Sequence, residues 1–254
     1  MIGLMLKDQE IRWLVKEKYN GVINEAAQID IARIKQGEPV AYVIGFSDFL
    51  GCKIDLSQRP LIPRSETEFW VEQVIRDINK DTSTSIKCLD MFTGSGCIGI
   101  AVLKNVPSTT VDFVDCDDMA ITQVIINCEL NNVAASRRQI IKSNMFEHVN
   151  DSSYDYIFAN PPYISENKIS KTQKSVLDYE PHRALFGGSD GLFFIKAFLD
   201  KALKYLNDTG KIYMEFDTHQ KDAIEKILIK NGFKEINFFQ DQFKKWRYLL
   251  LRKQ

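Results

Sequence analysis

Short apolar segments alternate with amphipathic segments over residues 86–230 of this chain, and that alternation limits the folds open to it. Strands are expected over five apolar segments: Ile86–Met91, Thr110–Val114, Gln139–Lys142, Tyr154–Ala159 and Lys211–Phe216. Helices are expected over four segments with helical periodicity: 97–104, 118–131, 191–206 and 218–230. Buried strands separated by crossover helices pair in parallel, with helices on both faces of the sheet. The sequence therefore predicts an α/β fold with a mostly parallel sheet.

The end of the chain has a different pattern. Two strand-like segments, "EINFFQ" and "WRYLLLR", are joined only by "DQFKK". A connection this short cannot hold a crossover, so these two strands should be antiparallel. We therefore expect the mostly parallel sheet to be followed by a C-terminal antiparallel hairpin.

The start of the chain predicts a small helical unit. Apolar positions recur at helix spacing over residues 4–19 and about 24–36, and Asn20-Gly21 breaks the pattern between them. The polar stretch "DTSTS" at residues 81–85 marks the change to alternating strands and helices. We divide the chain into three parts: a short helical N-terminal region at 1–37, a β-hairpin with a linking helix at 38–80, and the main domain at 81–254.

Two local patterns predict the middle part. The stretch "VAYVIGFSDFLGCKIDL", residues 40–56, has alternating apolar and aromatic residues around Ser47-Asp48 and favours a β-hairpin. Ser65 and Glu68 fit a capping box, in which each side chain accepts a hydrogen bond from the backbone N–H of the other residue. A helix should therefore begin near Glu66.

Composition narrows the functional classes. Lys plus Arg count 33 and Asp plus Glu 34, so no overall field draws the chain to nucleic acid or to an anionic membrane. The five cysteines are an odd number without the spacing of a zinc or redox motif, so we expect reduced, mostly packed thiols. No apolar run is long enough to span a membrane, and the first residues do not form a signal sequence. We expect a cytoplasmic monomer.

The first motif with chemical content is "CLDMFTGSGCIGI", residues 88–100. A strand ending at Asp90-Met91 leads into the turn Gly94-Ser95-Gly96 and then into a helix. This arrangement brings backbone N–H groups and a helix N-terminus to the carboxyl edge of the sheet, where α/β proteins bind ligands. The next strand ends at Asp115, whose carboxylate could accept both hydroxyls of a ribose. The pattern indicates a cofactor that contains a nucleoside.

The glycine turn resembles the first motif of class I S-adenosyl-L-methionine-dependent methyltransferases, which have a Rossmann-like fold. The resemblance implies that Asp90 lies near the methionine part of the cofactor, and that the loop residues bind it: Phe92, Thr93, Gly94, Ser95 and Gly96. Those enzymes commonly have glycine where this chain has Phe92. After the third strand, the resemblance implies that Asn144 accepts a hydrogen bond from the adenine amino group and that Met145 or Phe146 covers the adenine face.

The stretch "DYIFANPPYI", residues 155–164, ends the fourth strand at the same edge of the sheet. A methyl group on a sulfonium needs a nucleophile with an available lone pair, and an amide or aromatic amino nitrogen has its lone pair delocalised. Acceptors on its two hydrogens, the Asn160 side-chain oxygen and the Pro161 carbonyl, would favour the pyramidal geometry and stabilise the developing charge. The prolines, Pro162 included, stiffen the loop, and Tyr163 offers a flat face to a planar group. The motif predicts N-methylation of a planar NH2 group.

Three further segments identify the chain as similar to the HemK-like release factor glutamine methyltransferases: "EPVAYVIG" at 38–45, "LIPRSETE" at 61–68 and "YEPHRALFGGSDGL" at 179–192. The resemblance implies methylation of the glutamine in the Gly-Gly-Gln tip of class 1 peptide-chain release factors. It implies that Arg64 and Glu66–Glu68 roof the active site and that Glu180 lies in the loop beyond. For Arg64, an ion pair with Glu66 or Glu68 at the helix start is an alternative. Family members usually carry a longer N-terminal helical bundle, so the region that docks the substrate is expected to be reduced.

Two other functions stay open at this level. An adenine amino-group methyltransferase acting on DNA or RNA would use the same N-P-P-Y motif, although the near-neutral charge disfavours it and no target-recognition domain is evident. A cofactor-binding scaffold without activity of its own is the other alternative, suggested by the short N-terminal region and by Phe92 in the glycine turn.

Overall fold

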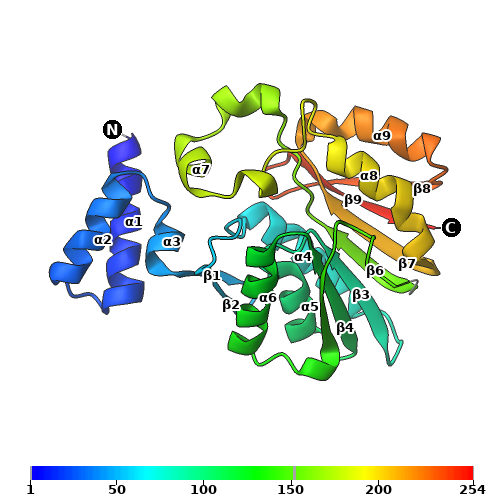
Figure 1. Ribbon diagram of the computed structural model, residues 1–254, viewed down its shortest axis with the longest axis horizontal. Helices are drawn as coiled ribbons and strands as arrows, with labels where there is room; N and C mark the ends of the chain where they lie inside the picture. Colours follow the sequence, from blue (N-terminus) through cyan, green and yellow to red (C-terminus); the bar gives the residue numbers. More distant parts are fainter. Residues whose placement is uncertain (1, 151–152, 254) are drawn as a thin grey trace.

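A twisted sheet forms the centre of the molecule. Within residues 2–150 and 153–253, which the computed structural model describes, its seven strands have the order β5-β4-β3-β6-β7-β9-β8 (Figure 1). The strands β3 to β7 pair in parallel, and β9 runs antiparallel between β7 and β8. The bounds are β3 (Ile86–Met91), β4 (Thr109–Asp115), β5 (Arg138–Lys142), β6 (Tyr154–Ala159), β7 (Leu206–Glu215), β8 (Glu235–Gln240) and β9 (Trp246–Arg252). The predicted α/β fold and its C-terminal antiparallel hairpin are confirmed.

Helices cover both faces of this sheet. The helices α4 (Ser65–Ile78), α5 (Cys97–Asn105) and α6 (Asp118–Leu130) pack on one face, whereas α8 (Phe193–Ala202) and α9 (Lys221–Lys230) pack on the other (Figure 1). The predicted helix over 191–206 is too long, because a 3-10 turn over Leu203–Tyr205 follows α8 and β7 already begins at Leu206. The predicted helix over 218–230 begins as a 3-10 turn, Thr218–Gln220, before α9.

The two faces of each central strand divide the core. Along β6, Tyr156 and Phe158 belong to the cluster under α4, α5 and α6, whereas Ile157 and Ala159 belong to the cluster under α8 and α9. Successive side chains of a strand point to opposite faces, so a strand buried on both faces reads as a continuous apolar run. That is why the apolar segments predicted the strand positions well.

The N-terminal helices stand beside the sheet as a separate small layer (Figure 1). α1 (Ile2–Tyr19) and α2 (Glu25–Lys35) pack with α3 (Val40–Ile44) around a cluster centred on Leu14 and Ile34. The bidentate bond of Arg33 to Glu38, and the further bond of Arg59 to Glu38, tie this layer to the chain that enters the main domain. The division at residue 37 stays a prediction, and its outer bounds, Met1 and Gln254, lie outside the described residues.

Two predictions for the middle region are wrong in part. The predicted hairpin over 40–56 is shorter, β1 (Phe46–Phe49) with β2 (Cys52–Asp55), because Val40–Ile44 forms the helix α3, which ends at Gly45 with φ of 100°. All five residues of α3 are buried, and a short run that is apolar on every side carries no period.

The predicted capping box is also absent. The helix α4 begins at Ser65 itself, with Arg64 as its N-cap, and the Ser65 hydroxyl donates to the neighbouring Glu66. Glu68 is drawn away from the helix end, because its carboxylate accepts the backbone N–H of Leu50 at 2.9 Å. A partner 18 positions distant in the chain competes with the local cap.

Cysteine burial agrees with the prediction of packed thiols. Cys52, Cys88, Cys97 and Cys128 are buried and Cys116 is exposed, and none is in a disulfide.

Over the described part of the chain, no helix combines the length and the apolar character needed to cross a membrane.

Candidate active site

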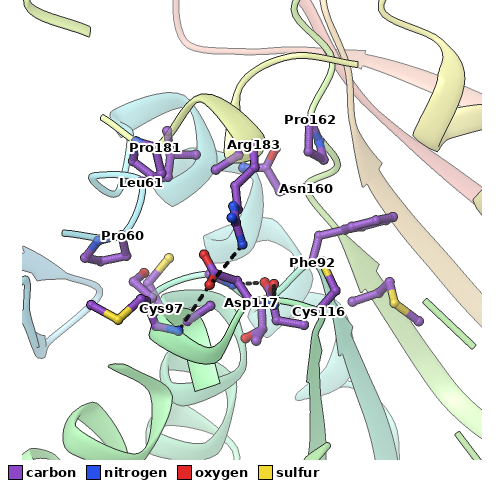
Figure 2. Close-up of a pocket in the computed structure, with 18 of the residues that line it drawn as sticks. Pro60, Leu61, Phe92, Cys97, Cys116, Asp117, Asn160, Pro162, Pro181 and Arg183 are labelled. Atoms are coloured by element: carbon purple, nitrogen blue, oxygen red, sulfur yellow. Dashed lines mark hydrogen bonds and ion pairs between the residues drawn. The ribbon is translucent and has the colours of Figure 1, made fainter. Parts of the chain in front are cut away.

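Two cavities meet at the carboxyl edge of the parallel sheet. The inner cavity, about 240 Å³, lies against the loops after β3, β4 and β5 and beneath the segment 58–64 (Figure 2). The outer cavity, about 430 Å³, lies against the loop after β6 and the end of β7. Both cavities are lined by Leu61, Arg64, Asn160 and Ala184. A ligand in one cavity would therefore reach a ligand in the other beside these four residues.

The loop after β3 forms the floor of the inner cavity. Phe92, Gly94 and Gly96 all have left-handed backbone, with φ of 60°, 54° and 80°. Glycine is required at position 96 on two counts, its φ and the 3.1 Å that would separate an added Cβ from Ile100 Cδ1. Phe92 adopts the conformation that glycine prefers, which explains the glycine usual at this position in similar enzymes. Its ring packs edge-on against Phe194 and Phe198.

The carboxylates of Asp115 and Asp90 hold this loop by hydrogen bonds. Asp115 accepts the backbone N–H of Gly94 at 2.9 Å through one oxygen and that of Asp117 at 3.0 Å through the other. Oδ2 of Asp90 accepts the Thr93 hydroxyl at 2.7 Å and the N–H of Gly99 at 3.0 Å. Asp115 also lines the inner cavity, together with Thr93, Gly94 and Ser95, whereas Asp90 lies beneath the loop and Gly96 lies at the start of α5.

Asp90 is the carboxyl group beneath the loop after β3, and its acidity is strongly perturbed. Its side chain is fully buried, and Oδ1 has no hydrogen-bond partner in the described structure. Burial raises the pKa of Asp90 to about 7, and the negative charge of Asp115 adds to the effect. Burial likewise raises the pKa of Asp115, against the backbone donors that lower it. A fully buried carboxyl, Asp90, and a half-buried one, Asp115, lie at this edge and favour a ligand with positive charge.

The loop after β5 supplies one wall of the inner cavity. Asn144 and Met145 line it, and the Asn144 amide nitrogen donates to Glu147 at 2.8 Å, which leaves the oxygen to accept. Phe146 does not line the cavity: it is buried in the core, stacked at 4.4 Å on Tyr205. Of the two residues expected to cover an adenine, only Met145 is in place, because the backbone turns at Met145, with φ of 50°, and sends Phe146 inward.

The loop after β6 stands at the junction. Asn160 lines both cavities, Pro162 the inner one, and Pro161 and Tyr163 the outer one. The Asn160 Nδ2 donates to the Thr67 hydroxyl at 3.4 Å, and the Tyr163 hydroxyl donates to Glu215 Oε1 at 2.9 Å. The residues predicted for methyl transfer are thus brought together, although the Tyr163 hydroxyl also has a structural partner.

Glu215 is a component of the site that the sequence analysis missed. It ends β7, is 1% exposed, and accepts hydrogen bonds from Thr67, Trp70 and Tyr163. Its only sequence signal is an acidic residue at the end of the apolar run "KIYMEF". A buried carboxylate without partners is costly, so an acidic residue there implies donors that fold onto it.

Two ion pairs close the site from above. Arg64 pairs with Glu180 at 2.6 Å, and the second Glu180 oxygen accepts the N–H of Ile62 at 3.1 Å. This is neither of the local pairings considered for Arg64, with Glu66 or Glu68. Figure 2 shows Arg183 extending across the inner cavity to Asp117, at 3.1 Å. Neither Arg183 nor Asp117 stands out in the sequence as a site residue.

Comparison with known proteins decides the family. A family model described as the methyltransferase small domain matches residues 71–185. The release factor glutamine methyltransferase of Thermodesulfovibrio yellowstonii is 36% identical over 223 residues, 88% of this chain and 79% of that protein. The chain belongs to the release factor glutamine methyltransferase family. The relative of the same name from Lactococcus lactis subsp. lactis is 35% identical over 87% of this chain and 79% of its own length.

Solved structures agree on the fold. The human METTL16 N-terminal domain in complex with SAH has a TM-score of 0.60 at 18% identity and covers 96% of this chain and 94% of its own. The ribosomal protein L11 methylase from Lactobacillus delbrueckii subsp. bulgaricus has a TM-score of 0.55 at 20% identity, over 78% of this chain and 83% of that one. Membership of the family makes this chain a methyltransferase, and the reading as an inactive scaffold is set aside.

Proposed function

We propose that the enzyme transfers a methyl group from S-adenosyl-L-methionine to the side-chain amide nitrogen of the glutamine in the Gly-Gly-Gln tip of class 1 release factors. The observation that carries the proposal is the position of Asn160, on the wall common to both cavities. A donor in the inner cavity and an amide entering from the outer cavity would meet there. The 35% and 36% identity to proteins named for this activity supports the choice of substrate.

The inner cavity suits the donor chemically. Asp115, Asn144 and Met145 all line it: Asp115 would accept the ribose hydroxyls, the oxygen of Asn144 would accept the adenine amino group, and Met145 would cover the adenine face. The loop residues Thr93, Gly94 and Ser95 would lie along the methionine part, with Asp90 beneath them. S-adenosyl-L-methionine bound there would supply a methyl group on a sulfonium, and the C–S electron pair would stay on sulfur, so that the neutral thioether is the leaving group. Asp90 and Asp115 favour its positive charge.

The outer cavity would admit the target amide. Asn160 Oδ1 and the Pro161 carbonyl accept its two N–H groups, which weakens the amide resonance and frees the nitrogen lone pair for attack on the methyl carbon. As the N–C bond forms and the C–S bond breaks, the two acceptors stabilise the positive charge on nitrogen, and one N–H proton then leaves to solvent. Tyr163 would pack beside the planar amide. Arg64, paired with Glu180, holds the roof over both groups.

A labelling experiment tests the assignment. Purified enzyme would receive donor labelled in the methyl group together with a bacterial release factor, the same factor with the tip glutamine replaced by alanine, or total RNA. Label is expected in the wild-type factor alone. Label in RNA, or equal labelling of the alanine-tip factor, would contradict the proposal.

Partner and place of action follow from the substrate. Release factors act with ribosomes, so we infer that this enzyme works in the cytoplasm, as a monomer that contacts the factor without binding nucleic acid itself. The helices α1 and α2 are the extra surface available for docking the factor beyond the tip. Deleting the predicted N-terminal region, 1–37, should raise KM for the full-length factor more than for a short tip peptide.

A further inference from the structure

The Glu215 carboxylate is linked to both side chains expected beside the target amide. It accepts the Tyr163 hydroxyl directly, and it accepts the Thr67 hydroxyl, which in turn accepts the Asn160 amide N–H. Thr67 is 2% exposed and Glu215 is 1% exposed, so water has little access to the bond between them. The network joins α4, the loop after β6 and the end of β7.

Counting hydrogens fixes the direction of each bond. Trp70 Nε1 can only donate, and it lies 2.7 Å from Glu215 Oε2, so that oxygen is an acceptor. The Thr67 hydroxyl lies 2.7 Å from the same oxygen and must therefore donate to it. A hydroxyl has one hydrogen, so the Thr67 oxygen can offer Asn160 only a lone pair. Asn160 must then direct its NH2 toward Thr67, at 3.4 Å.

We propose that Thr67 and Glu215 are positioning residues that hold the Asn160 amide in one of its two orientations, and so make the site selective for an amide over a carboxylate. The two orientations of an asparagine amide have nearly the same shape and differ in which end donates. With Nδ2 turned inward, Oδ1 is left for the substrate. This inference rests on the proposed function, because it assumes that the group to be methylated is an NH2.

Orientation decides what the site can recognise. Oδ1 facing outward accepts an N–H of a glutamine, and together with the Pro161 carbonyl it presents two acceptors that repel the carboxylate of a glutamate. A flipped amide would place its own NH2 against the substrate NH2 and lose one acceptor at the reacting nitrogen. Buried donors and acceptors that lack partners are what make polar sites selective.

Variants of Thr67 separate orientation from folding. Thr67→Val keeps the shape and removes the hydroxyl, and Thr67→Ser keeps the hydroxyl. Thr122→Val is the matched control, since the Thr122 hydroxyl donates to the carbonyl of Asp118 on the exposed side of α6. For each variant, kcat, KM and donor affinity are measured with a bacterial release factor. The Kd is then measured, with S-adenosylhomocysteine present, for the factor with its natural glutamine tip and for the factor with a glutamate tip.

The expected result is a fall in kcat of about 10 to 100-fold for Thr67→Val, with donor affinity kept, since the misdirected group lies at the reacting nitrogen. In the same variant, the Kd for the glutamate tip divided by the Kd for the glutamine tip should fall by about tenfold. Thr67→Ser should restore most of both quantities, and Thr122→Val should resemble wild type. A general loss of packing would not change the ratio of the two tips.

Three outcomes would count against the inference or against the proposed function on which it rests. If wild type labels the release factor but Thr67→Val keeps both kcat and the preference for glutamine, the orientation argument is wrong and the proposed function stands. If wild type labels no release factor, the proposed function itself fails. If Thr67→Val binds donor normally and loses turnover with an unchanged tip ratio, Thr67 acts by packing alone and the selectivity claim is overturned.

Discussion

The loops after β3 and β6 leave the sheet side by side, since Met91 and Ala159 are register partners at the ends of paired strands. They are built by opposite means. The loop after β3 has three left-handed residues, and carboxylates hold it through its backbone N–H groups and the Thr93 hydroxyl. The loop after β6 has two prolines, and its polar side chains are held by the hydrogen bonds that Asn160 donates to Thr67 and Tyr163 donates to Glu215.

This difference separates binding from chemistry. Backbone N–H groups and a left-handed turn let a large cofactor approach closely, so changes there should act on donor affinity. A loop that fixes one amide beside the reacting atom contributes mainly in the transition state, so changes there should act on kcat. The two loops thus predict two kinetic signatures from residues only one strand apart.

The largest effect is expected for Asn160→Ala. Removing one acceptor from the reacting nitrogen should lower kcat by about 10² to 10³-fold, and donor Kd should stay within about threefold. Rapid-quench measurement of a single turnover at saturating donor gives the first quantity, and titration calorimetry gives the second. Asn231→Ala is the matched control, on an exposed turn where the amide bonds Asp200. Retained turnover in Asn160→Ala would remove the amide clamp from the mechanism.

The opposite signature is expected for Asp115→Ala. The loop N–H of Gly94 loses its acceptor together with the expected ribose contact, so donor affinity should fall by about 1 to 3 kcal/mol while kcat at saturating donor changes little. Asp118→Ala is the control, because that carboxylate is 76% exposed, close in sequence and outside both cavities. Equal donor dissociation constants in Asp115→Ala and wild type would exclude Asp115 from the donor site.

Much of this division could be predicted from the sequence. The strands are buried on both faces, so their apolar runs showed where the chain reaches the carboxyl edge, and the glycine turn and N-P-P-Y followed directly. What failed were contacts between distant segments. Glu68 accepts the backbone N–H of Leu50 and does not cap its own helix, and Arg64 pairs with Glu180, 116 positions along the chain. A local pattern cannot show a competing partner that folding brings in.

Glu215, which was missed, shares that property, because its partner Thr67 lies 148 positions away. Thr67 itself lies in "LIPRSETE", within the range Glu66–Glu68 expected to roof the active site, but that motif does not show its hydrogen bonds to Glu215 and Asn160. Phe146 is the opposite case. It was expected to cover the adenine face, but the left-handed backbone at Met145 turns its ring into the core. Sequence located the loops, whereas the direction of individual side chains depended on the backbone angles and partners of the folded chain.

The acidity of Asp90 gives the loop after β3 a pH signature. Its pKa is raised to about 7 by burial, so folding favours the protonated carboxyl, and its contribution to stability is lost as pH rises from about 3.8 to about 7. A cationic donor favours the ionised form instead. Donor affinity should therefore increase by about tenfold from pH 6 to pH 8.

Two comparisons isolate that effect. Asp90→Asn should flatten the dependence, and S-adenosylhomocysteine, which shares the donor's amino and carboxyl groups but lacks the sulfonium charge, should show a shallower one in wild type. Calorimetric titration at several pH values gives all three curves. Parallel curves for wild type and Asp90→Asn would assign the pH dependence to another group.

The smallest effect on the enzyme is expected from removing the ion pair between Arg183 and Asp117. Arg183 spans the inner cavity to Asp117, but its side chain is 66% exposed, so the ion pair is screened by solvent. Arg183→Ala should raise the rate of donor dissociation by at most about fivefold and leave single-turnover kcat unaltered. Arg183 is the partner to change, because the Asp117 carboxylate also caps α6 by accepting the N–H of Met119.

Stopped-flow displacement of donor at low and high salt measures the dissociation rate, since salt should bring the wild-type rate toward that of the variant. A dissociation rate that is the same in both proteins and insensitive to salt would show that the ion pair does not retain the donor, and that the roof built on Arg64 and Glu180 closes the cavity without it.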